Sequence, residues 1–212
     1  MAVVARRPRG RPRSFDREAA LQRAMEVFWS KGYEATSLHD LTEAMGINPP
    51  SLYAAFGDKE RLYLEALASY QDWRREILGR MLDDAPTARA GVEMVLRESA
   101  TEISKSGHPR GCMVAMSIAS CSSTSPEAQS KLAERRAMGR RRVKERIDRG
   151  IRDGDVPPGT DSAALADFYH AVFIGMAMQA REGASRRNLL ATVEAAMRAW
   201  PEGKTASIRP RR

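Results

Sequence analysis

The sequence lacks three features on which whole classes of protein depend: a cysteine framework, a long apolar run and an export signal. Two cysteines among 212 residues cannot form a disulfide framework, so we expect a cytoplasmic protein with reduced thiols. No run of about 18 apolar residues is present, and the sequence therefore predicts no membrane-spanning helix. The opening segment MAVVA is too short for the apolar region of a signal peptide, and arginines follow it at once.

The usual signatures of catalysis are scarce as well. The sequence has no glycine-rich phosphate loop and no paired-carboxylate motif. One alternative is a small thiol enzyme that uses Cys112 with His108, but no third residue is placed to orient such a pair. We therefore expect no enzymatic activity, no cofactor and no metal site.

Positive charge is abundant, and it is unevenly distributed. The formal net charge is +8, yet residues 1–13 contribute +5 and residues 201–212 contribute +3, which leaves residues 14–200 neutral. Charge of this kind indicates an anionic partner, either nucleic acid or an anionic membrane surface. We expect a neutral folded body between two basic, disordered tails. A further basic run, residues 131–152, is interpreted as the solvated face of a long helix.

Apolar residues recur with a helical period through most of the chain, and no segment alternates as a strand does. The pattern predicts an all-α protein of about nine helices. Besides the helices between residues 36 and 82, helices are expected near residues 16–31, 87–105, 111–122, 126–152, 161–181 and 185–200, with glycine and proline at the breaks.

Residues 36–82 are predicted to hold three helices whose ends are marked by capping residues. Ser37, with Asp40 three residues later, fits a capping box, and Gly46 supplies a left-handed turn. Asn48 is placed to cap the next, short helix. Two short helices joined by a tight turn make a helix-turn-helix, whose second helix fits the major groove of B-DNA.

The stretch TSLHDLTEAMGINPPSLYAAFGDKERLYLEAL resembles the DNA-binding domain of TetR-family transcriptional regulators. The resemblance covers about residues 14–66. Its pattern G-x-x-x-x-x-L-Y-x-x-F-x-x-K is formed here by Gly46, Leu52, Tyr53, Phe56 and Lys59. The GRPRSFD and FWSKGYEATSL segments are also similar to the ComR-like branch, which includes copper-responsive regulators.

The resemblance implies an all-α homodimer that binds a palindromic, double-stranded DNA operator and a small-molecule effector of unknown identity. It divides the chain into a basic arm (1–13), a helix-turn-helix domain (14–60), an effector-binding and dimerisation domain (61–200) and a basic tail (201–212).

The family's DNA contacts, transferred to this sequence, divide by chemistry. Phosphate contacts are expected from hydroxyl groups and one ammonium group: Thr36, Ser37, Tyr53 and Lys59. Base-edge contacts are expected along the second helix, from Asn48, Pro49, Pro50 and Ser51. Asn48 is alternatively only a cap. The second helix has no Arg or Lys where related sequences often carry one, so we expect modest direct readout.

The basic arm offers a compensating source of affinity. Arg9-Gly10-Arg11-Pro12-Arg13 resembles an AT-hook core, and arginines suit the narrow minor groove of A·T-rich DNA. Residues 14–62 hold five basic and eight acidic residues, so the arm changes the charge of the DNA-binding unit from −3 to +2. We therefore predict that Arg9, Arg11 and Arg13 contact DNA, with a merely solubilising tail as the alternative.

The segment from Gly111 to Cys121 is rich in small and soft side chains, which leave space and adapt to irregular shapes. In the resembling family the equivalent helix lines the effector cavity. The candidate pocket residues are Cys112, Met113, Met116, His170 and Phe173. Tight packing without a pocket is the alternative for this segment, and His170 is alternatively a core histidine.

The two cysteines, Cys112 and Cys121, suggest a different kind of signal. On one continuous helix, residues nine apart lie about half a turn out of phase, and such a pair cannot form a bridge or share a metal. For this reason a thiol- or metal-responsive regulator that uses the two cysteines is only an alternative to the main prediction.

The last two helices carry an apolar stripe and small residues that permit close approach. The resemblance implies that they pair with their symmetry mates in a four-helix bundle. The candidate interface residues are Phe168, Val172, Gly175 and Met176. A purely intramolecular core is the alternative.

Together these features predict a DNA-binding transcriptional regulator, more specifically a repressor that a small effector releases from its operator. An architectural DNA-binding protein without an effector is the alternative from a different class.

Overall fold

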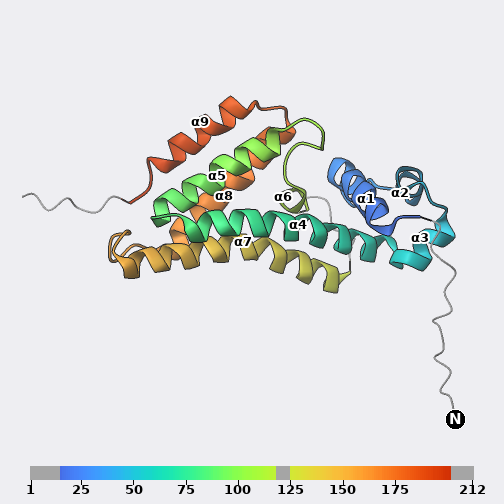
Figure 1. Cartoon of the computed structure of the whole chain (residues 1–212), viewed down its shortest axis with the longest axis horizontal. Coiled ribbons are helices and arrows are strands. Elements are labelled where there is room, and N and C mark those ends of the chain that lie inside the picture. Colours follow the sequence, from blue (N-terminus) through green and yellow to red (C-terminus); the bar gives the residue numbers. More distant parts are fainter. Residues whose placement is uncertain (1–14, 118–124, 202–212) are drawn as a thin grey trace, which may run out of the picture.

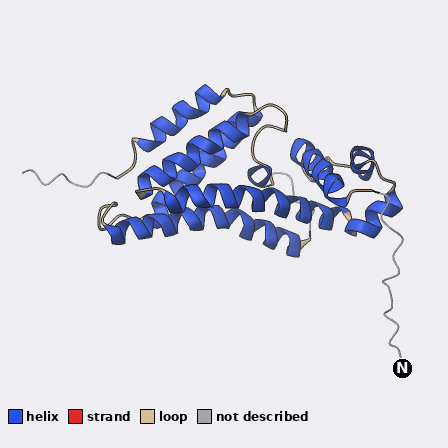
Figure 2. Cartoon of the chain, viewed as in Figure 1, coloured by secondary structure: helices blue, strands red, loops and turns tan. Residues whose placement is uncertain are grey.

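The computed structural model describes residues 15–117 and 125–201, and within them the chain forms nine α-helices and no strand (Figures 1 and 2). The helices are α1 (Arg17–Lys31), α2 (Leu38–Met45), α3 (Pro49–Phe56), α4 (Lys59–Asp84), α5 (Ala88–Ser104), α6 (Met113–Met116), α7 (Pro126–Asp153), α8 (Ser162–Arg181) and α9 (Arg186–Met197). The predicted all-α class is confirmed for these residues. None of the helices described is both long enough and apolar enough to cross a bilayer.

Side-chain caps fix the ends of the first three helices where the sequence predicts them. The Asp16 carboxylate accepts from the backbone of Glu18 at 2.9 Å and begins α1. Ser37 and Asp40 form the reciprocal capping box at the start of α2. Gly46 ends α2 with φ of 66°, a conformation that glycine adopts without steric cost. The turn between α2 and α3 is therefore determined locally.

The first three helices pack on the beginning of α4 through an aromatic cluster and an ion pair. The Phe28 ring lies 5.0 Å from that of Tyr63, edge to face. The Arg17 guanidinium pairs with Glu65 of α4 and also donates to the carbonyl of Ala55 in α3, at 3.3 Å. α1, α3 and the first turns of α4 are thus tied together by directional contacts.

The other end of α4 belongs to a second helical layer. α4 and α7, of 26 and 28 residues, run side by side, α5 and α8 pack on them, and α9 packs on α5 and α8 (Figure 1). The core between these helices is apolar and includes Leu96, Ile103, Ile147 and Tyr169. α4 is consequently a shared element, with its N-terminal turns in the helix-turn-helix unit and its C-terminal turns in this layer.

One predicted helix is wrong in its described part. Instead of a helix over residues 111–122, the structure has the single turn α6, with Cys112 at its N-cap and Ser117 at its C-cap. Residues 118–124, which include Cys121, lie outside the described residues. Because Cys112 precedes the helix, the half-turn argument about the two cysteines does not apply. Gly111 approaches α8 closely, since a Cβ there would lie 3.0 Å from the Ala177 carbonyl oxygen.

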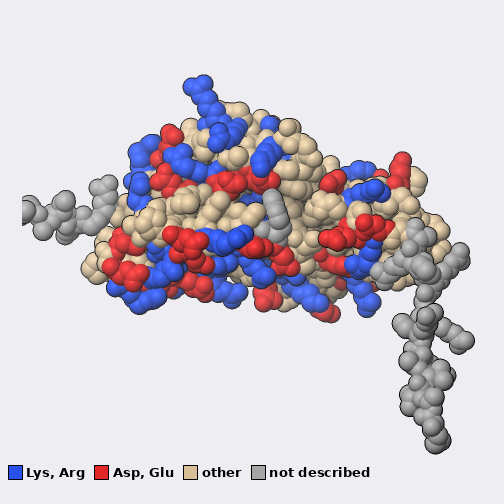
Figure 3. Space-filling model, viewed as in Figure 1, with Lys and Arg blue, Asp and Glu red and all other residues tan. Residues whose placement is uncertain are grey.

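Acidic and basic side chains are interspersed over the face of the described body in Figure 3, with no region of a single sign. This distribution agrees with the neutral charge of residues 14–200. A candidate anion-binding site must therefore be sought in local groups of basic residues rather than in the overall electrostatic field of the protein.

Candidate DNA-binding surface and effector cavity

The start of α2 presents one of its two predicted phosphate ligands. Ser37 is exposed, and its hydroxyl oxygen accepts from the Asp40 backbone at 3.0 Å, which leaves the hydroxyl proton available to a phosphate. Thr36 does not fit its predicted role. Its side chain is 1% exposed and its hydroxyl donates to the Gly32 carbonyl at 2.6 Å. The cause is the end of α1, whose last carbonyl groups lack partners within the helix.

α3 presents an uncharged outer face. Asn48, Pro49 and Pro50 are exposed, and Tyr53 is 49% exposed, while Leu52 is buried in the core. The Asn48 side-chain oxygen caps the helix by accepting from the Ser51 backbone at 2.9 Å. Its amide group is thus oriented by the cap, with the NH₂ end still able to donate.

Lys59 is half-buried at the first turn of α4, and its ammonium group lies 4.4 Å from the centroid of the Tyr33 ring. The ring holds the charge close to the α3–α4 junction. The three predicted arm residues, Arg9, Arg11 and Arg13, lie outside the described residues.

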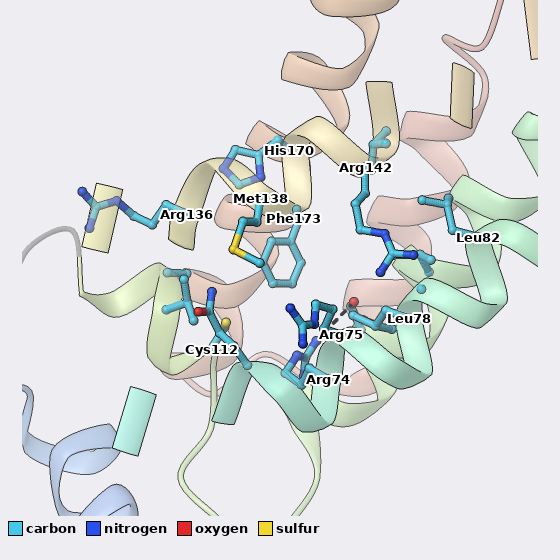
Figure 4. A pocket seen from close by; sticks show the side chains of 18 of the residues that line it. Arg74, Arg75, Leu78, Leu82, Cys112, Arg136, Met138, Arg142, His170 and Phe173 are labelled. Atoms are coloured by element: carbon cyan, nitrogen blue, oxygen red, sulfur yellow. Dashed lines mark hydrogen bonds between the residues drawn. The ribbon is translucent and has the colours of Figure 1, made fainter. Parts of the chain in front are cut away.

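A cavity of about 200 Å³ opens between α4, α5, α7 and α8. Three of the predicted pocket residues line it: Cys112, His170 and Phe173 (Figure 4). The other two, Met113 and Met116, do not, because Met113 is buried in the core and Met116 packs beside it. Burial lowers the pKa of His170, so its ring is neutral near pH 7.

The cavity has a feature that the sequence analysis missed, a group of arginines. Its walls are mostly apolar, but they include Arg74, Arg75, Arg135, Arg136 and Arg142, and no acidic residue. Three of these arginines belong to the run 131–152, so its interpretation as a wholly solvated face is wrong. Figure 4 shows Arg74 and Arg75 entering from α4 and Arg142 from α7 on the opposite side. Arg135, Met138 and Arg142 share one helical face, which is visible in the sequence, but the sequence does not show what that face packs against.

The predicted dimer residues fall into two groups. Phe168 is 41% exposed and Gly175 is exposed, while Val172 is half-buried. Met176 is fully buried inside its own chain and is wrongly assigned to an interface. The helical period explains the error, since Met176 lies about 80° around α8 from Phe168, far enough to face the core, while Gly175 lies almost in line with Phe168.

A polar link joins α8 to the end of α1. Arg181, in the last turn of α8, donates to the carbonyl groups of Trp29, at 3.0 Å, and Ser30. The Trp29 ring is itself packed between Tyr70 and His108, with centroid distances of 4.9 and 4.7 Å. The helix-turn-helix unit is therefore attached to the second layer by α8 as well as by α4.

Two family models match the chain. The model for bacterial regulatory proteins of the tetR family matches residues 20–66, and the tetracyclin repressor-like C-terminal domain matches residues 89–200. Among curated proteins, the HTH-type transcriptional repressor ComR of Escherichia coli (strain K12) is 34% identical over 93% of this chain and 94% of its own length. The HTH-type transcriptional repressor BdcR of the same organism is 35% identical over 86% of this chain and 88% of its own length.

Solved structures agree with these matches. A cysteine mutant of the TetR family transcriptional regulator CifR, complexed with 26-bp double-strand operator DNA, is 48% identical, with a TM-score of 0.84 over 91% of this chain and all of that one. A putative TetR transcriptional regulator from Rhodococcus sp. RHA1 is 40% identical, with a TM-score of 0.60 over 87% of this chain and 98% of that one. The chain belongs to the tetR family of bacterial regulatory proteins and is a DNA-binding transcriptional regulator.

Proposed function

We propose that this protein is a homodimeric repressor that leaves its operator when a small effector occupies the cavity. The observation that carries the proposal is the position of α4. The helix contacts α1 and α3 near its N-terminus and lines the cavity from Tyr70 to Leu82. A ligand that shifts the cavity end of α4 also shifts α3, because α3 packs on the N-terminal turns of the same helix. The ion pair between Arg17 and Glu65 fixes α1 to those turns as well.

The second attachment supports the same mechanism. Arg181 binds the last carbonyl groups of α1, and its helix α8 contributes His170 and Phe173 to the cavity. A ligand therefore contacts both helices that position the DNA-binding unit. Movement of one relative to the other changes the tilt of α3 and provides the two states that allosteric release requires.

Contacts with DNA are proposed along the exposed ends of α2 and α3 and from the arm. Ser37, Tyr53 and Lys59 are assigned to phosphates, and the outer face of α3, with Asn48, Pro49, Pro50 and Ser51, to base edges. Because this face carries no cation, the proposal gives Arg9, Arg11 and Arg13 a large part of the affinity, through the minor groove.

The dimer is proposed to form through α8 and α9. The exposed face of α8 is apolar and partly made of small residues, with Phe168, Gly175 and Met178 along it. Ala191 and Ala195 are exposed on α9. Small residues permit close helix packing, and a two-fold axis there would place the two α3 helices on successive half-sites of a palindromic operator.

Operator binding is tested by footprinting the purified full-length protein on the DNA that precedes its own gene. We expect a protected palindrome, and at least a thousandfold preference over unrelated DNA of equal length in fluorescence anisotropy at physiological salt. Equal affinity for both duplexes would contradict a regulator with its own operator and would favour an architectural DNA-binding protein.

A further inference from the structure

We propose that the effector is an amphipathic organic anion, an apolar body with one carboxylate group, and that Arg74 binds the carboxylate. The proposal rests on the effector-binding function above and specifies the chemistry of its ligand.

The charge of the cavity is entirely of one sign. Its five arginines face no Asp or Glu in the lining, and residues 118–124, which follow the α6 turn, contain no acidic residue either. Two of the arginines are neutralised outside the cavity, Arg75 by Asp72 at 3.2 Å and Arg142 by Asp83 at 2.8 Å. Within the described residues, Arg135 and Arg136 donate to neutral oxygens, those of Gln71 and Ser117. A net positive charge therefore remains for a ligand.

Arg74 is the decisive residue because it is buried. Its side chain is 8% exposed, and a guanidinium group stays charged at any physiological pH. The group donates to the Ser99 hydroxyl at 3.4 Å and lies 5.8 Å from the Tyr70 ring centroid. No carboxylate of the described residues lies within ion-pair distance of it. Glu102, whose charge acts on Arg74 from farther away, is bonded to Lys105.

The other buried arginine shows how this chain neutralises such a group when no ligand is involved. Arg146 donates to the carbonyl groups of Leu82 and Ala85 and lies 3.6 Å from the Asp155 carboxylate. Burial of a charge is unfavourable unless a counter-charge and hydrogen bonds are supplied. The fold supplies a carboxylate to Arg146, although the Nη1 of that residue has no hydrogen-bond partner, and supplies no carboxylate to Arg74.

A second buried group points to the same place. The Tyr70 hydroxyl is buried in the cavity wall near the Cys112 thiol, the Met113 backbone and the Arg74 guanidinium, but forms no hydrogen bond of good geometry with the described residues. Burial raises its pKa well above the usual value, so the hydroxyl keeps its proton and can donate it. A carboxylate at this position would accept from both Tyr70 and Arg74, which would satisfy the two groups together.

The size and remaining walls of the cavity define the rest of the ligand. A volume of about 200 Å³ exceeds the roughly 150 Å³ of an engineered cavity that binds benzene. Leu78, Leu82, Val92 and Phe173 provide apolar walls. A carboxylate joined to one aromatic ring, or to an alkyl chain of similar volume, fits both the space and the chemistry.

The test compares acids with their neutral amides on the full-length protein. Phenylacetate and octanoate are titrated against phenylacetamide and octanamide, and the thermal unfolding midpoint and operator anisotropy are recorded at equal ionic strength. Ligands that prefer the native state raise its stability. We expect each acid to bind about tenfold or more tightly than its amide, and to release the operator at correspondingly lower concentration.

Two substitutions assign the preference to Arg74. Arg74→Met should abolish the difference between acid and amide, and without any ligand it should unfold at the same temperature as the wild type or a few degrees higher, because a buried charge has been removed. Arg74→Lys should restore part of the acid preference. Arg140→Met, which removes an exposed arginine of α7 that is paired with Asp167 of α8, is the control and should respond like the wild type.

Acids and amides that bind the wild type equally, acids that do not bind it at all, or an acid preference that persists in Arg74→Met would each overturn the inference. Release of the operator by the amides alone would also overturn it while leaving the effector-released repressor intact. If the protein shows no operator preference, the proposed function fails, and the thermal midpoints still decide whether Arg74 binds a carboxylate.

Discussion

The helix-turn-helix unit and the cavity domain treat their polar groups in opposite ways. In α1–α3, caps and ion pairs bind polar groups at the surface, as Asp40 does with Ser37 and Lys31. In the cavity, the Arg74 guanidinium is buried without a carboxylate among the described residues, and the Tyr70 hydroxyl beside it forms no hydrogen bond of good geometry there. In the first region, local hydrogen bonds and ion pairs fix the conformation of the surface that contacts DNA. In the second region, the buried polar groups can still bind a ligand, as we propose.

The largest expected effect is on the proposed dimer, because operator binding by two half-sites requires two subunits. Phe168→Arg places a charge on the proposed interface, and we expect a monomer whose operator affinity is lower by at least a hundredfold, because each half-site is then bound separately. Sedimentation velocity and anisotropy measure the two losses. Met94→Arg, at a site on α5 that is 45% exposed, is the matched control and should remain dimeric. A wild-type monomer would show that the proposed architecture is incorrect.

The next effect concerns the DNA-binding side alone. Deletion of residues 1–13 should flatten the plot of log Kd against log salt concentration by several units, because each phosphate neutralised contributes about 0.9 to the slope. Deletion of residues 203–212, at the other end of the chain, is the control. An unchanged slope would mean that the arm is not part of the DNA-binding surface.

A smaller effect sharpens the contrast between the two buried arginines. Arg146→Met leaves Asp155 and two carbonyl groups without their partner, and we expect about 3 kcal/mol of lost stability, the range found when one member of a buried pair is removed. Urea unfolding measures the change. For Arg74→Met we expect no loss of stability, or a small gain. Equal losses in the two variants would erase the distinction between a structural arginine and a ligand-binding one.

The smallest effect is on acid stability. The Lys31 ammonium, and then the Ser37 backbone, hold the pKa of Asp40 well below its usual range. A lowered folded-state pKa contributes stability that is complete above the unfolded value near 4 and is lost as the pH falls through the folded value. The difference in unfolding free energy between the wild type and Asp40→Asn should therefore shrink between pH 6 and pH 3. A constant difference would mean that the ion pair contributes nothing.

The parts of the structure that depend on local chemistry were predictable. Caps at Asp16, Ser37 and Asn48 and the turn at Gly46 follow from hydrogen bonds within a few residues, and they define the helix-turn-helix. Its membership of a family followed from the same residues.

The parts that depend on how distant helices pack were not predictable. The burial of Thr36 and of Met176 is decided by neighbours on other turns and helices. The run of charges in α7 looked solvated because its sequence does not tell which face meets α4, and that contact turns Arg135, Arg136 and Arg142 toward the cavity.

The length of α4 has a mechanical consequence. From Arg74 back to Lys59 the helix extends about 22 Å, at about 1.5 Å per residue. Treated as a rigid rod pivoting near the cavity, it converts a tilt of about 5° into a displacement of roughly 2 Å at its far end. In the proposed two-fold dimer the two displacements would add, so that a change too small to disturb the core would alter the separation of the two α3 helices and their fit to the helical repeat of DNA.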